Sequence, residues 1–419
     1  MEEKTYLCID LKCFFASVEC VERGLDPFKA NLVVADPSRG NGGICLAISP
    51  AMKALGIKNR CRIFEIPEDV EYITAMPRMK KYMEKSAEIY GIYLRYVAPE
   101  DIHVYSIDEC FLDITAYMPT YEKTAVEIAV MLMDAVRKKT GICATAGIGT
   151  NLFLAKIALD ITAKHSPDNI GYLDEDLFKK TIWHHRPITD IWNVGRGIAN
   201  RLEKYGVLDL EGVAHMREEV LYKEFGVNAE YLIDHAKGYE PCTIKEIHEY
   251  HSKENSLSNG QILFENYNYE DAFLALKEMV DIIVLDLVSK KLVTNSISLT
   301  VGYAQSAEPS TGGTRKINEF TNSQKKIMAH FERLYKETTK KSTLIRRLNV
   351  GLNNVVGEEY ASLDMFTDIK AEEKERSMQG AIISIKEKYG KNAVLKGMNL
   401  QSKATSQIRN KLIGGHNGE

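Results

Sequence analysis

The sequence predicts a multidomain α/β protein, on three observations. The chain has 419 residues, which is long for a single hydrophobic core, so two to four domains are expected. Strand-like and helix-like segments alternate over the first 165 residues, and a second strand-rich region begins near residue 250. Between them, from about residue 166, the pattern changes to short helices.

The first 60 residues predict three short strands and two helices. TYLCID (5–10) is apolar and β-prone, and the helical spacing of FFASVECVERG ends at Gly24. Two further strands, ANLVVAD (30–36) and GICLAIS (43–49), are joined by the turn-rich PSRGNGG. PAMKALG then predicts a short helix that begins at Pro50 and ends at Gly56.

The next hundred residues complete an α/β sandwich with one face of its sheet covered. HVYSIDECFLDIT (103–115) predicts two strands that meet in a tight reversal around Asp108 and Glu109. A long helix follows, and another strand, GICATAGIGT (141–150), precedes a second helix, LFLAKIALDITAK (152–164). The apolar face of the long helix comprises Ala125, Ile128, Ala129, Leu132 and Val136.

The rest of the chain predicts a helical region, a second α/β module and a tail. TDIWNVGRGIANRLEKYGV (189–207) indicates a helix, a Gly-rich turn and a second helix. From about residue 250 the order is strand, helix, strand, strand, helix, strand, with one helix near 323–337. Beyond about residue 358 the chain is charged and poor in apolar residues, and its final GGHNGE is expected to be frayed.

Composition excludes several classes of protein. The formal net charge of −4 argues against a uniformly basic coat for nucleic acid but allows local basic patches. The eight cysteines include no CxxC pair, so neither a structural zinc site nor a disulfide framework is expected. With no signal peptide and no run of about 18 apolar residues, the chain is expected to be soluble and cytoplasmic.

Three carboxylates stand at the ends of apolar, β-prone segments. They are Asp10 and, in the segment SIDE (106–109), Asp108 and Glu109. If the two segments are neighbouring strands, the three acids repel one another unless a cation neutralises them, and hard oxygen ligands suit magnesium or manganese. The alternative is that each acid caps a strand or turn at the surface. The pair His184 and His185 is interpreted as a surface pair, because partner acids are not evident around it.

The order and spacing of several motifs resemble a known family. IDLKCFFASVE, YSIDECFLDI and GIGTNLFLAKIALDITAK resemble the three palm motifs of Y-family translesion DNA polymerases. IWNVGRGIANRLEKYGV resembles that family's helix–hairpin–helix thumb, and SKENSLSNGQ and LIRRLNVGL resemble strands of its little finger. AMKALG, IWNVG and RNKLIGGH favour the UmuC-type branch, the polymerase V catalytic subunit, and within it single-chain relatives from Gram-positive bacteria.

The resemblance implies a right-hand polymerase with five parts. The palm would comprise residues 1–23 and 81–165, and the fingers residues 24–80. The thumb would comprise 166–243, the little finger 244–357, and a tail with a clamp-binding motif 358–419. The implied activity is template-directed, low-fidelity DNA synthesis past lesions during the SOS response, by a cytoplasmic enzyme that associates with the nucleoid.

The resemblance also assigns roles around the carboxylates. Asp10, Asp108 and Glu109, with the carbonyl of Leu11, would hold two Mg²⁺ ions, for which Mn²⁺ could substitute. The nucleotide would contact the backbone from Cys13 through Phe14 to Phe15, and the side chains of Ser49, Lys53 and Lys164. Phe15 takes the steric-gate position, where a rigid ring excludes a 2′-hydroxyl, whereas the ring of Phe14 is expected in the core.

This sequence departs from the family pattern at two positions of the site. Pro50 stands where some relatives have an aromatic phosphate contact, and Lys12 stands where many members have Asp or Asn. Both changes are expected to tune the geometry of the nucleotide and to leave the reaction intact.

The remaining assignments concern DNA and protein partners. Val194, Gly195 and Gly197 in the Gly-rich turn would contact DNA phosphates, unless the turn is an ordinary helical hairpin. Ser256, Ser258, Arg346 and Arg347 would grip the template backbone. SLDMF (362–366) resembles a sliding-clamp peptide with Leu363, Met365 and Phe366 as anchors and Ser362 in place of the usual Gln.

The implied partners are primer–template DNA, a deoxynucleoside triphosphate, the clamp and accessory proteins of the RecA or UmuD type, with no membrane. Two other functions use part of the same pattern. A nucleotidyl cyclase shares the palm topology and the carboxylates but needs no steric gate or thumb. A non-catalytic clamp adaptor would need no intact carboxylates.

Overall fold

The computed structural model describes residues 4–251, 255–305, 308–361 and 369–418. It divides into two compact units, residues 1–251 with 416–419 and residues 252–415, each described here by itself. Within the described ranges, no helix combines the length and the apolar character needed to cross a membrane.

A five-stranded sheet forms the centre of the first unit. Its strands are β1 (Tyr6–Leu11), β5 (Ile102–Val104), β6 (Glu109–Asp113), β7 (Ala144–Gly149) and β8 (Ile170–Leu173), in the spatial order β5-β6-β1-β7-β8. β1 is antiparallel to both of its neighbours, and β8 is parallel to β7. β8 therefore belongs to this sheet although it follows residue 165, where the palm was predicted to end.

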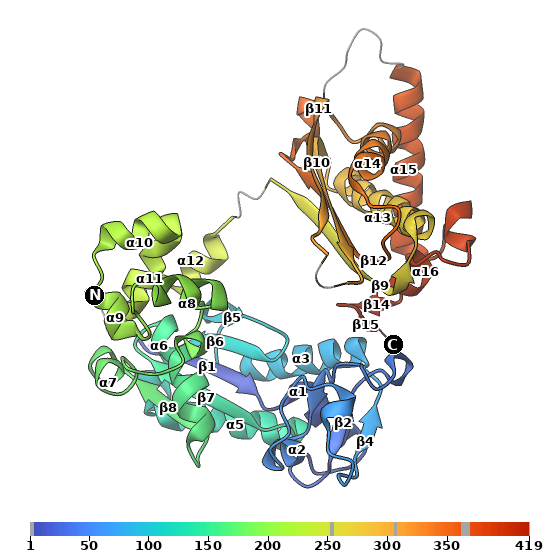
Figure 1. The fold of residues 1–419 in the computed structure, drawn as a ribbon. Coiled ribbons are helices and arrows are strands. Elements are labelled where there is room, and N and C mark those ends of the chain that lie inside the picture. The colour runs from blue at the N-terminus through green and yellow to red at the C-terminus, as the bar shows by residue number, and fades with distance from the viewer. Residues whose placement is uncertain (1–3, 252–254, 306–307, 362–368, 419) are drawn as a thin grey trace. The chain divides into compact units, whose positions relative to one another are not determined.

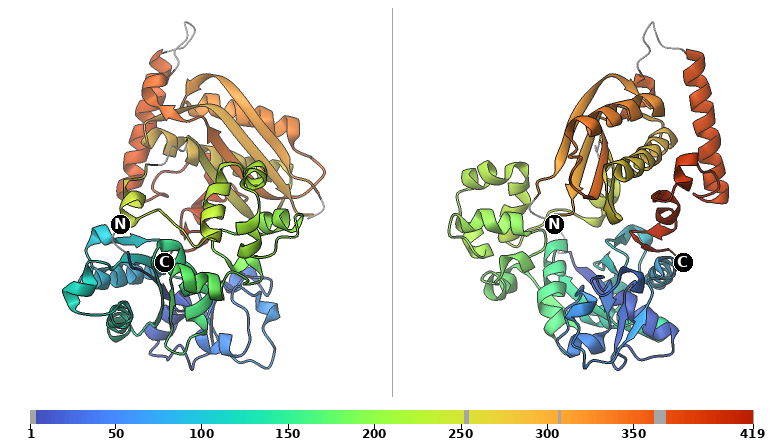
Figure 2. Two further views of the ribbon diagram at one scale, coloured as in Figure 1. Left: turned by 90° about the vertical axis from the view of Figure 1, so that its left-hand side faces the viewer. Right: turned by 45° about the vertical axis from the view of Figure 1, so that its right-hand side comes forward.

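Helices cover this sheet on both faces (Figures 1 and 2). They are α1 (Phe14–Glu22), α3 (Met79–Tyr93), α4 (Tyr117–Tyr121), α5 (Ala125–Thr140) and α6 (Leu152–Ile157). Leu7, Ile9 and Leu11 of β1 share a buried cluster with residues of α1, α3 and α5. Cys8 on the opposite face packs with residues of α6. The covering of a second face by α6 goes beyond the predicted one-sided sandwich.

Two glycines of β7 let α6 approach the sheet closely. A Cβ atom at Gly147 would lie 2.1 Å from the backbone oxygen of Ala155, and one at Gly149 would lie 2.2 Å from the nitrogen of Ala155. Only glycine permits such an approach. After α6 the chain continues as a π-helical turn over Ala158–Thr162 and a 3₁₀ turn, so the helix predicted over 152–164 is α-helical only in its first half.

A smaller sheet lies between α1 and α3 in the sequence. It contains β2 (Leu32–Val34), β3 (Ala47–Ile48) and β4 (Ile73–Ala75) in the order β3-β2-β4, with α2 (Pro50–Ala54) after β3. β3 is shorter than the predicted strand over 43–49, because Ile44 makes only an isolated bridge with Arg62. This sheet has its own buried cluster.

Short helices follow, with a separate buried cluster. They are α7 (Glu175–Thr181), α8 (Arg196–Glu203), α9 (Leu210–His215), α10 (Glu218–Phe225), α11 (Ala229–Ala236) and α12 (Ile244–Glu249). The prediction of two helices around the Gly-rich turn is half wrong. Before the turn there is a single 3₁₀ turn, Ile188–Asp190, and the chain then bends through Asn193, whose φ of 66° is incompatible with a continuous α-helix.

The second unit contains a five-stranded antiparallel sheet, in which the short strand β13 pairs with one end of β10, and helices lie on one face of the sheet (Figures 1 and 2). Its strands follow the order β11-β10-β12-β9, and α13 and α14 pack on the face that carries Leu299, Val350 and Leu352. The elements are β9 (Leu257–Tyr267), α13 (Tyr269–Ser289), β10 (Leu292–Tyr303), β11 (Thr311–Thr321), α14 (Gln324–Thr338), β12 (Ile345–Asn353) and β13 (Val356–Gly357).

The segment after residue 368 is charged, as predicted, but folded, and the final GGHNGE, which was predicted to be frayed, contains a short strand. It comprises α15 (Ile369–Tyr389), α16 (Ser406–Arg409) and the two-residue strands β14 (Leu412–Ile413) and β15 (His416–Asn417), which pair with each other. Glu278 of α13 anchors this segment. Its buried carboxylate accepts hydrogen bonds from Thr405 Oγ1 at 3.0 Å and Asn399 Nδ2 at 2.8 Å. The sequence did not predict this folded segment, because it is attached through polar contacts and contains few apolar residues.

Candidate active site

The antiparallel pairing of β1 with β6 brings the three predicted carboxylates together. Asp10 and Glu109 are directly opposite partners in the ladder, and the backbone N–H of Leu11 donates to the carbonyl of Asp108 at 2.9 Å. The reversal occupies residues 105–108, and Glu109 is already the first residue of β6. Asp10 precedes Asp108 and Glu109 by about a hundred residues in the sequence, and the predicted proximity of the two segments is confirmed.

The carboxylates of this cluster lie close to two ammonium groups, those of Lys156 and Lys164. Burial raises the pKa of Asp10 from its ordinary 3.8 to about 7. The ammonium of Lys164 opposes the rise, whereas the negative charges of Asp108 and Glu109 add to it. The carboxylate of Asp108 has a hydrogen-bond partner within its own turn: Oδ1 accepts a hydrogen bond of 2.7 Å from the hydroxyl of Ser106. Carboxylates that lie this close together repel one another, and a nearby positive charge relieves that repulsion.

Lys156 is a site residue that sequence reasoning missed. Its buried ammonium donates to Glu109 Oε2 at 2.8 Å and forms an ion pair with Asp160 at 3.1 Å. The thiol of Cys8, whose pKa burial raises, donates to Glu109 Oε1 at 3.0 Å. The sequence feature that could have revealed Lys156 is its spacing: Lys156, Asp160 and Lys164 follow one another at intervals of four residues, which places them on one helix face. Glu109 is therefore held from two sides.

The start of α1 lies next to the carboxylates. Cys13 precedes the helix with a left-handed φ of 48°, which is uncommon for a residue other than glycine. This conformation turns the chain sharply from β1 into α1. Phe14 enters the core with 3% of its surface exposed, as predicted, and Phe15 stays half-buried. Strained backbone at such a junction is a feature of functional sites.

The predicted cationic residues surround the same region. Lys53 in the last turn of α2 is exposed and lies beside the thiol of Cys13. Lys164 is half-exposed and pairs with Asp160 at 2.7 Å.

Two other residues of the predicted site contact the protein itself. The ammonium of Lys12, which departs from the family pattern, donates a hydrogen bond to the side-chain oxygen of Asn169. Ser49 is fully buried, and its hydroxyl caps α2 by accepting the N–H of Met52 at 3.3 Å.

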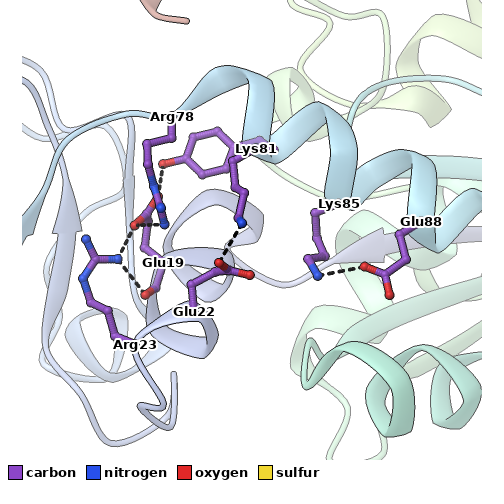
Figure 3. Close-up of polar contacts among 8 residues, drawn as sticks. Glu19, Glu22, Arg23, Arg78, Lys81, Lys85 and Glu88 are labelled. Carbon is purple, nitrogen blue, oxygen red and sulfur yellow. Dashed lines mark hydrogen bonds and ion pairs between the residues drawn. The ribbon is translucent and has the colours of Figure 1, made fainter. Parts of the chain in front are cut away.

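A polar cluster fastens α1 to α3 behind these residues (Figure 3). The carboxylate of Glu19 is fully buried and accepts two hydrogen bonds from Arg78, at 2.9 Å from Nε and 2.8 Å from Nη2, and another from Arg23. Tyr82 donates its hydroxyl to Glu19 Oε1 at 2.8 Å. Burial alone would raise the pKa of Glu19, but these hydrogen bonds lower it below its ordinary 4.5.

This cluster yields a pH-dependent prediction. Because the pKa of Glu19 is lower in the folded than in the unfolded state, Glu19 stabilises the fold above pH 4.5, and this contribution disappears as the pH falls through the lowered value. We expect Glu19→Gln to lower the free energy of unfolding by about 2 kcal/mol at pH 7, because it leaves two partly exposed arginines without their charge partner.

Urea unfolding at pH 7 and at pH 4 measures this difference, which should shrink at the lower pH. Glu22→Gln is the matched control on the same helix. Glu22 pairs with Lys81 at 2.9 Å in a partly exposed position, so its loss should change the stability by less than about 0.5 kcal/mol. Equal effects of the two substitutions would contradict the prediction.

A comparison with known proteins identifies the family. Residues 9–160 match the impB/mucB/samB family, and residues 254–365 match the C-terminal domain of that family, which together is more than half of the chain. The putative UV-damage repair protein UvrX of Bacillus subtilis is 30% identical, over 99% of this chain and 97% of its own length. This chain is a Y-family translesion DNA polymerase.

Further relatives agree with the fold of this polymerase. DNA polymerase IV 2 of Bacillus subtilis is 28% identical over 99% of each chain. The structure of a Y-family DNA polymerase chimera of Dbh and Dpo4 superposes with a TM-score of 0.62 at 21% identity, over 84% of this chain and 99% of the chimera. The predicted right-hand polymerase fold is confirmed. Assignment to the UmuC-type branch stays a prediction.

The Gly-rich turn of the polymerase presents backbone at the surface. Gly195 and Gly197 are exposed, and a Cβ atom at either would meet no neighbour within 4 Å. The side chain of Val194 is buried, so only its backbone is available for a ligand. Asn193 before the turn has a φ of 66°. No neighbouring atom of the described residues therefore blocks the approach of a phosphate to the backbone of Gly195 and Gly197. The contact itself stays a prediction.

The predicted grip of the second unit lies on the face of its sheet that the helices leave uncovered. Gly351, opposite Ser258, and Arg347, opposite Ile262, belong to this face. A bulge between Ile345 and Arg347 leaves Arg346 outside the ladder, and the flanking Ile345 and Leu348 are buried. Adjacent residues of a regular strand point to opposite faces, so the bulge lets both arginines remain at least partly exposed. Ser256 is also exposed.

Two other predictions, a clamp-binding peptide and a surface pair of histidines without partner acids, have different outcomes. The clamp-binding residues Leu363, Met365 and Phe366 lie outside the described residues. Both histidines do have acidic partners, since Glu211 lies 3.3 Å from His184 and Asp190 lies 3.0 Å from His185. His184 lies within 4.8 Å of ligand atoms of Asp209 and Glu211, a group that could hold a metal. However, both oxygens of Asp209 are engaged, one by Arg186 at 2.7 Å and the other by the N–H of Gly212 at 3.0 Å, which makes it a helix cap.

Proposed function

We propose that the polymerase adds deoxynucleotides to a primer 3′-hydroxyl at the cluster of Asp10, Asp108 and Glu109. The observation that carries this proposal is the register of β1 with β6, which sets Asp10 opposite Glu109 and next to the turn of Asp108. Membership of the Y family makes polymerisation of DNA the reaction. The roles of individual residues are inferred from their positions.

The donor set fits magnesium. All three side chains offer carboxylate oxygens, the hard ligands that Mg²⁺ prefers. Burial, and after it the charges of Asp108 and Glu109, raise the pKa of Asp10, and a bound divalent cation would favour its ionised form. The carbonyl of Leu11 would complete the set for a second ion. When bound, two Mg²⁺ ions would stabilise the charge that develops on the attacking and leaving oxygens of an in-line phosphoryl transfer.

The protein's own groups would orient the substrates. The N–H groups at the start of α1, from Cys13 to Phe15, would cradle the triphosphate at the positive end of the helix. Lys53 and Lys164 would neutralise its phosphates, and buried Ser49 would act by fixing α2, which carries Lys53. The 3′-hydroxyl loses its proton to water, its oxygen forms a bond to the α-phosphorus, and the bond from that phosphorus to the bridging oxygen of the β-phosphate breaks, so that pyrophosphate leaves.

Lys156 and Cys8 would keep Glu109 in place throughout this reaction. The ammonium of Lys156 lies 2.8 Å from Oε2 and 2.7 Å from Oε1 of Glu109, and Cys8 also donates to Oε1, so the carboxylate cannot rotate freely. Phe15, half-buried at the start of α1, would lie under the sugar and exclude a 2′-hydroxyl.

The two basic residues of the bulge give a prediction about DNA binding. Phosphate contacts release counterions, so each contact steepens the salt dependence of affinity. The double substitution Arg346→Ala with Arg347→Ala should weaken binding of primer–template DNA about tenfold at 0.1 M salt and reduce the slope of log K against log salt by about 2.

Fluorescence anisotropy at several KCl concentrations measures both quantities. Lys336→Ala is the matched control, since Lys336 is an exposed cation on α14, in the layer of helices behind the sheet. If the control changes the slope as much as the double variant does, the sheet face is not the grip.

Translesion synthesis is tested by primer extension. The polymerase should extend a primer past a template lesion in the presence of dNTPs and Mg²⁺, and EDTA should stop extension. A nucleotidyl cyclase would instead release a cyclic nucleotide without template, and a clamp adaptor would bind the clamp without extension. Adding the sliding clamp, or RecA-type and UmuD-type proteins, to the same assay tests those partners. Extension that is independent of template would refute the proposal.

A further inference from the structure

Tyr82 of α3 lies directly against Phe15. The two rings are stacked, with centroids 4.6 Å apart and an angle of 30° between their planes. Tyr82 is fully buried, whereas Phe15 is half-buried. Tyr82 therefore supports the face of Phe15 that packs toward the protein.

The hydroxyl of Tyr82 fixes the supporting ring in turn. It donates to the fully buried Glu19 at 2.8 Å, and Arg78 holds that carboxylate with two hydrogen bonds (Figure 3). A chain of contacts thus leads from Arg78 through Glu19 and Tyr82 to Phe15. The ring of Tyr82 cannot tilt without breaking a hydrogen bond to a buried charge.

Packing alone does not account for this arrangement. Tyr82 is a polar partner of the buried ion pair between Glu19 and Arg78. Such a group is often no more stabilising than apolar side chains of the same volume, so for stability alone an aliphatic residue could fill position 82. What an aliphatic residue cannot do is present a flat surface in a fixed orientation. Phe15 alone could occupy more than one rotamer, since aromatic residues on helices use two χ1 values.

We propose that Tyr82 is a positioning residue for sugar discrimination, because it holds the ring of Phe15 in the orientation that collides with a 2′-hydroxyl. The inference rests on the proposed gate role of Phe15 and extends it to residues outside the nucleotide site. Without the stack, Phe15 would turn aside for a ribonucleotide at little cost, and selectivity would fall while the chemistry continued.

The test compares single-nucleotide incorporation of a dNTP and the matching rNTP opposite the same template base. Tyr82→Leu removes the ring, and it should lower the ratio of kcat/KM for dNTP to that for rNTP about tenfold, equivalent to about 1.4 kcal/mol. Its kcat/KM for the dNTP should stay within about threefold of the wild type. Tyr82→Phe keeps the stack but loses the hydrogen bond, so it should lower the ratio about two- to threefold.

Controls separate positioning from damage to the fold. Tyr90→Leu changes a partly buried tyrosine two turns further along α3 that packs on the same core, and it should leave the ratio unchanged. Combining Tyr82→Leu with Phe15→Ala should give the ratio of Phe15→Ala alone, because the support acts only through the gate. A further, additive loss in the double variant would overturn the proposal.

The outcomes also separate this inference from the gate itself. If Phe15→Ala loses discrimination but Tyr82→Leu keeps it, the gate stands and the role of Tyr82 is refuted. If Phe15→Ala keeps discrimination, both are refuted. Should Tyr82→Leu fail to fold, as judged by its melting curve, Tyr82→Phe decides, and an unchanged ratio in that variant overturns the proposal.

Discussion

Asp108→Ala should lower dNTP incorporation by at least about a thousandfold, equivalent to about 4 kcal/mol of transition-state stabilisation. Asp108 lies at the end of the turn before β6, where Ser106 orients its carboxylate and its backbone carbonyl pairs with Leu11. Asp108, like Asp10, would help to hold both magnesium ions, so its loss should remove part of the charge that binds them. Steady-state primer extension with a single dNTP measures the effect.

Two controls make the result specific to the site. Asp134→Ala removes a half-exposed acid of α5 that pairs with Lys138, and it should leave incorporation within about twofold. Binding of primer–template DNA, measured by anisotropy, should change little in Asp108→Ala. Retention of more than about a tenth of the activity in Asp108→Ala would place the reaction elsewhere.

Phe15→Ala should reduce the selectivity for deoxynucleotides by about a hundredfold or more. A ring that excludes the 2′-hydroxyl acts by collision, which costs several kcal/mol, and alanine leaves room for a ribose. Incorporation of the dNTP should fall far less, because the triphosphate contacts of the backbone and lysines remain. The ratio of kcat/KM for dNTP to that for rNTP opposite one template base gives the answer.

Phe14→Leu is the matched control on the adjacent residue. Phe14 is buried in the palm core, so shortening it should cost about 1–2 kcal/mol of stability and lower the melting temperature without changing sugar selectivity. Loss of selectivity in Phe14→Leu, or its retention in Phe15→Ala, would contradict the separate roles of the two rings.

Local sequence patterns determined much of this molecule. The strands and helices around residues 5–22 and 103–164 follow from apolar periodicity, because a face that packs on a core must repeat with the period of its element. The position of Asp10 and Glu109 at strand ends then made their pairing predictable, and the structure sets them in register. The contrast between Phe14 and Phe15 came instead from the resemblance to the Y family, which places a steric gate at position 15.

The tertiary structure alone decided how the site is supported. Lys156 reaches Glu109 only because α6 lies on glycines of β7, and Tyr82 reaches Phe15 only because α3 packs along α1. The bulge at Arg346 and the anchorage of the C-terminal segment on Glu278 are also contacts between distant residues. Hydrophobic periodicity specifies which face of an element is buried, but not which distant polar group it will meet. That is set by register, close approach and packing.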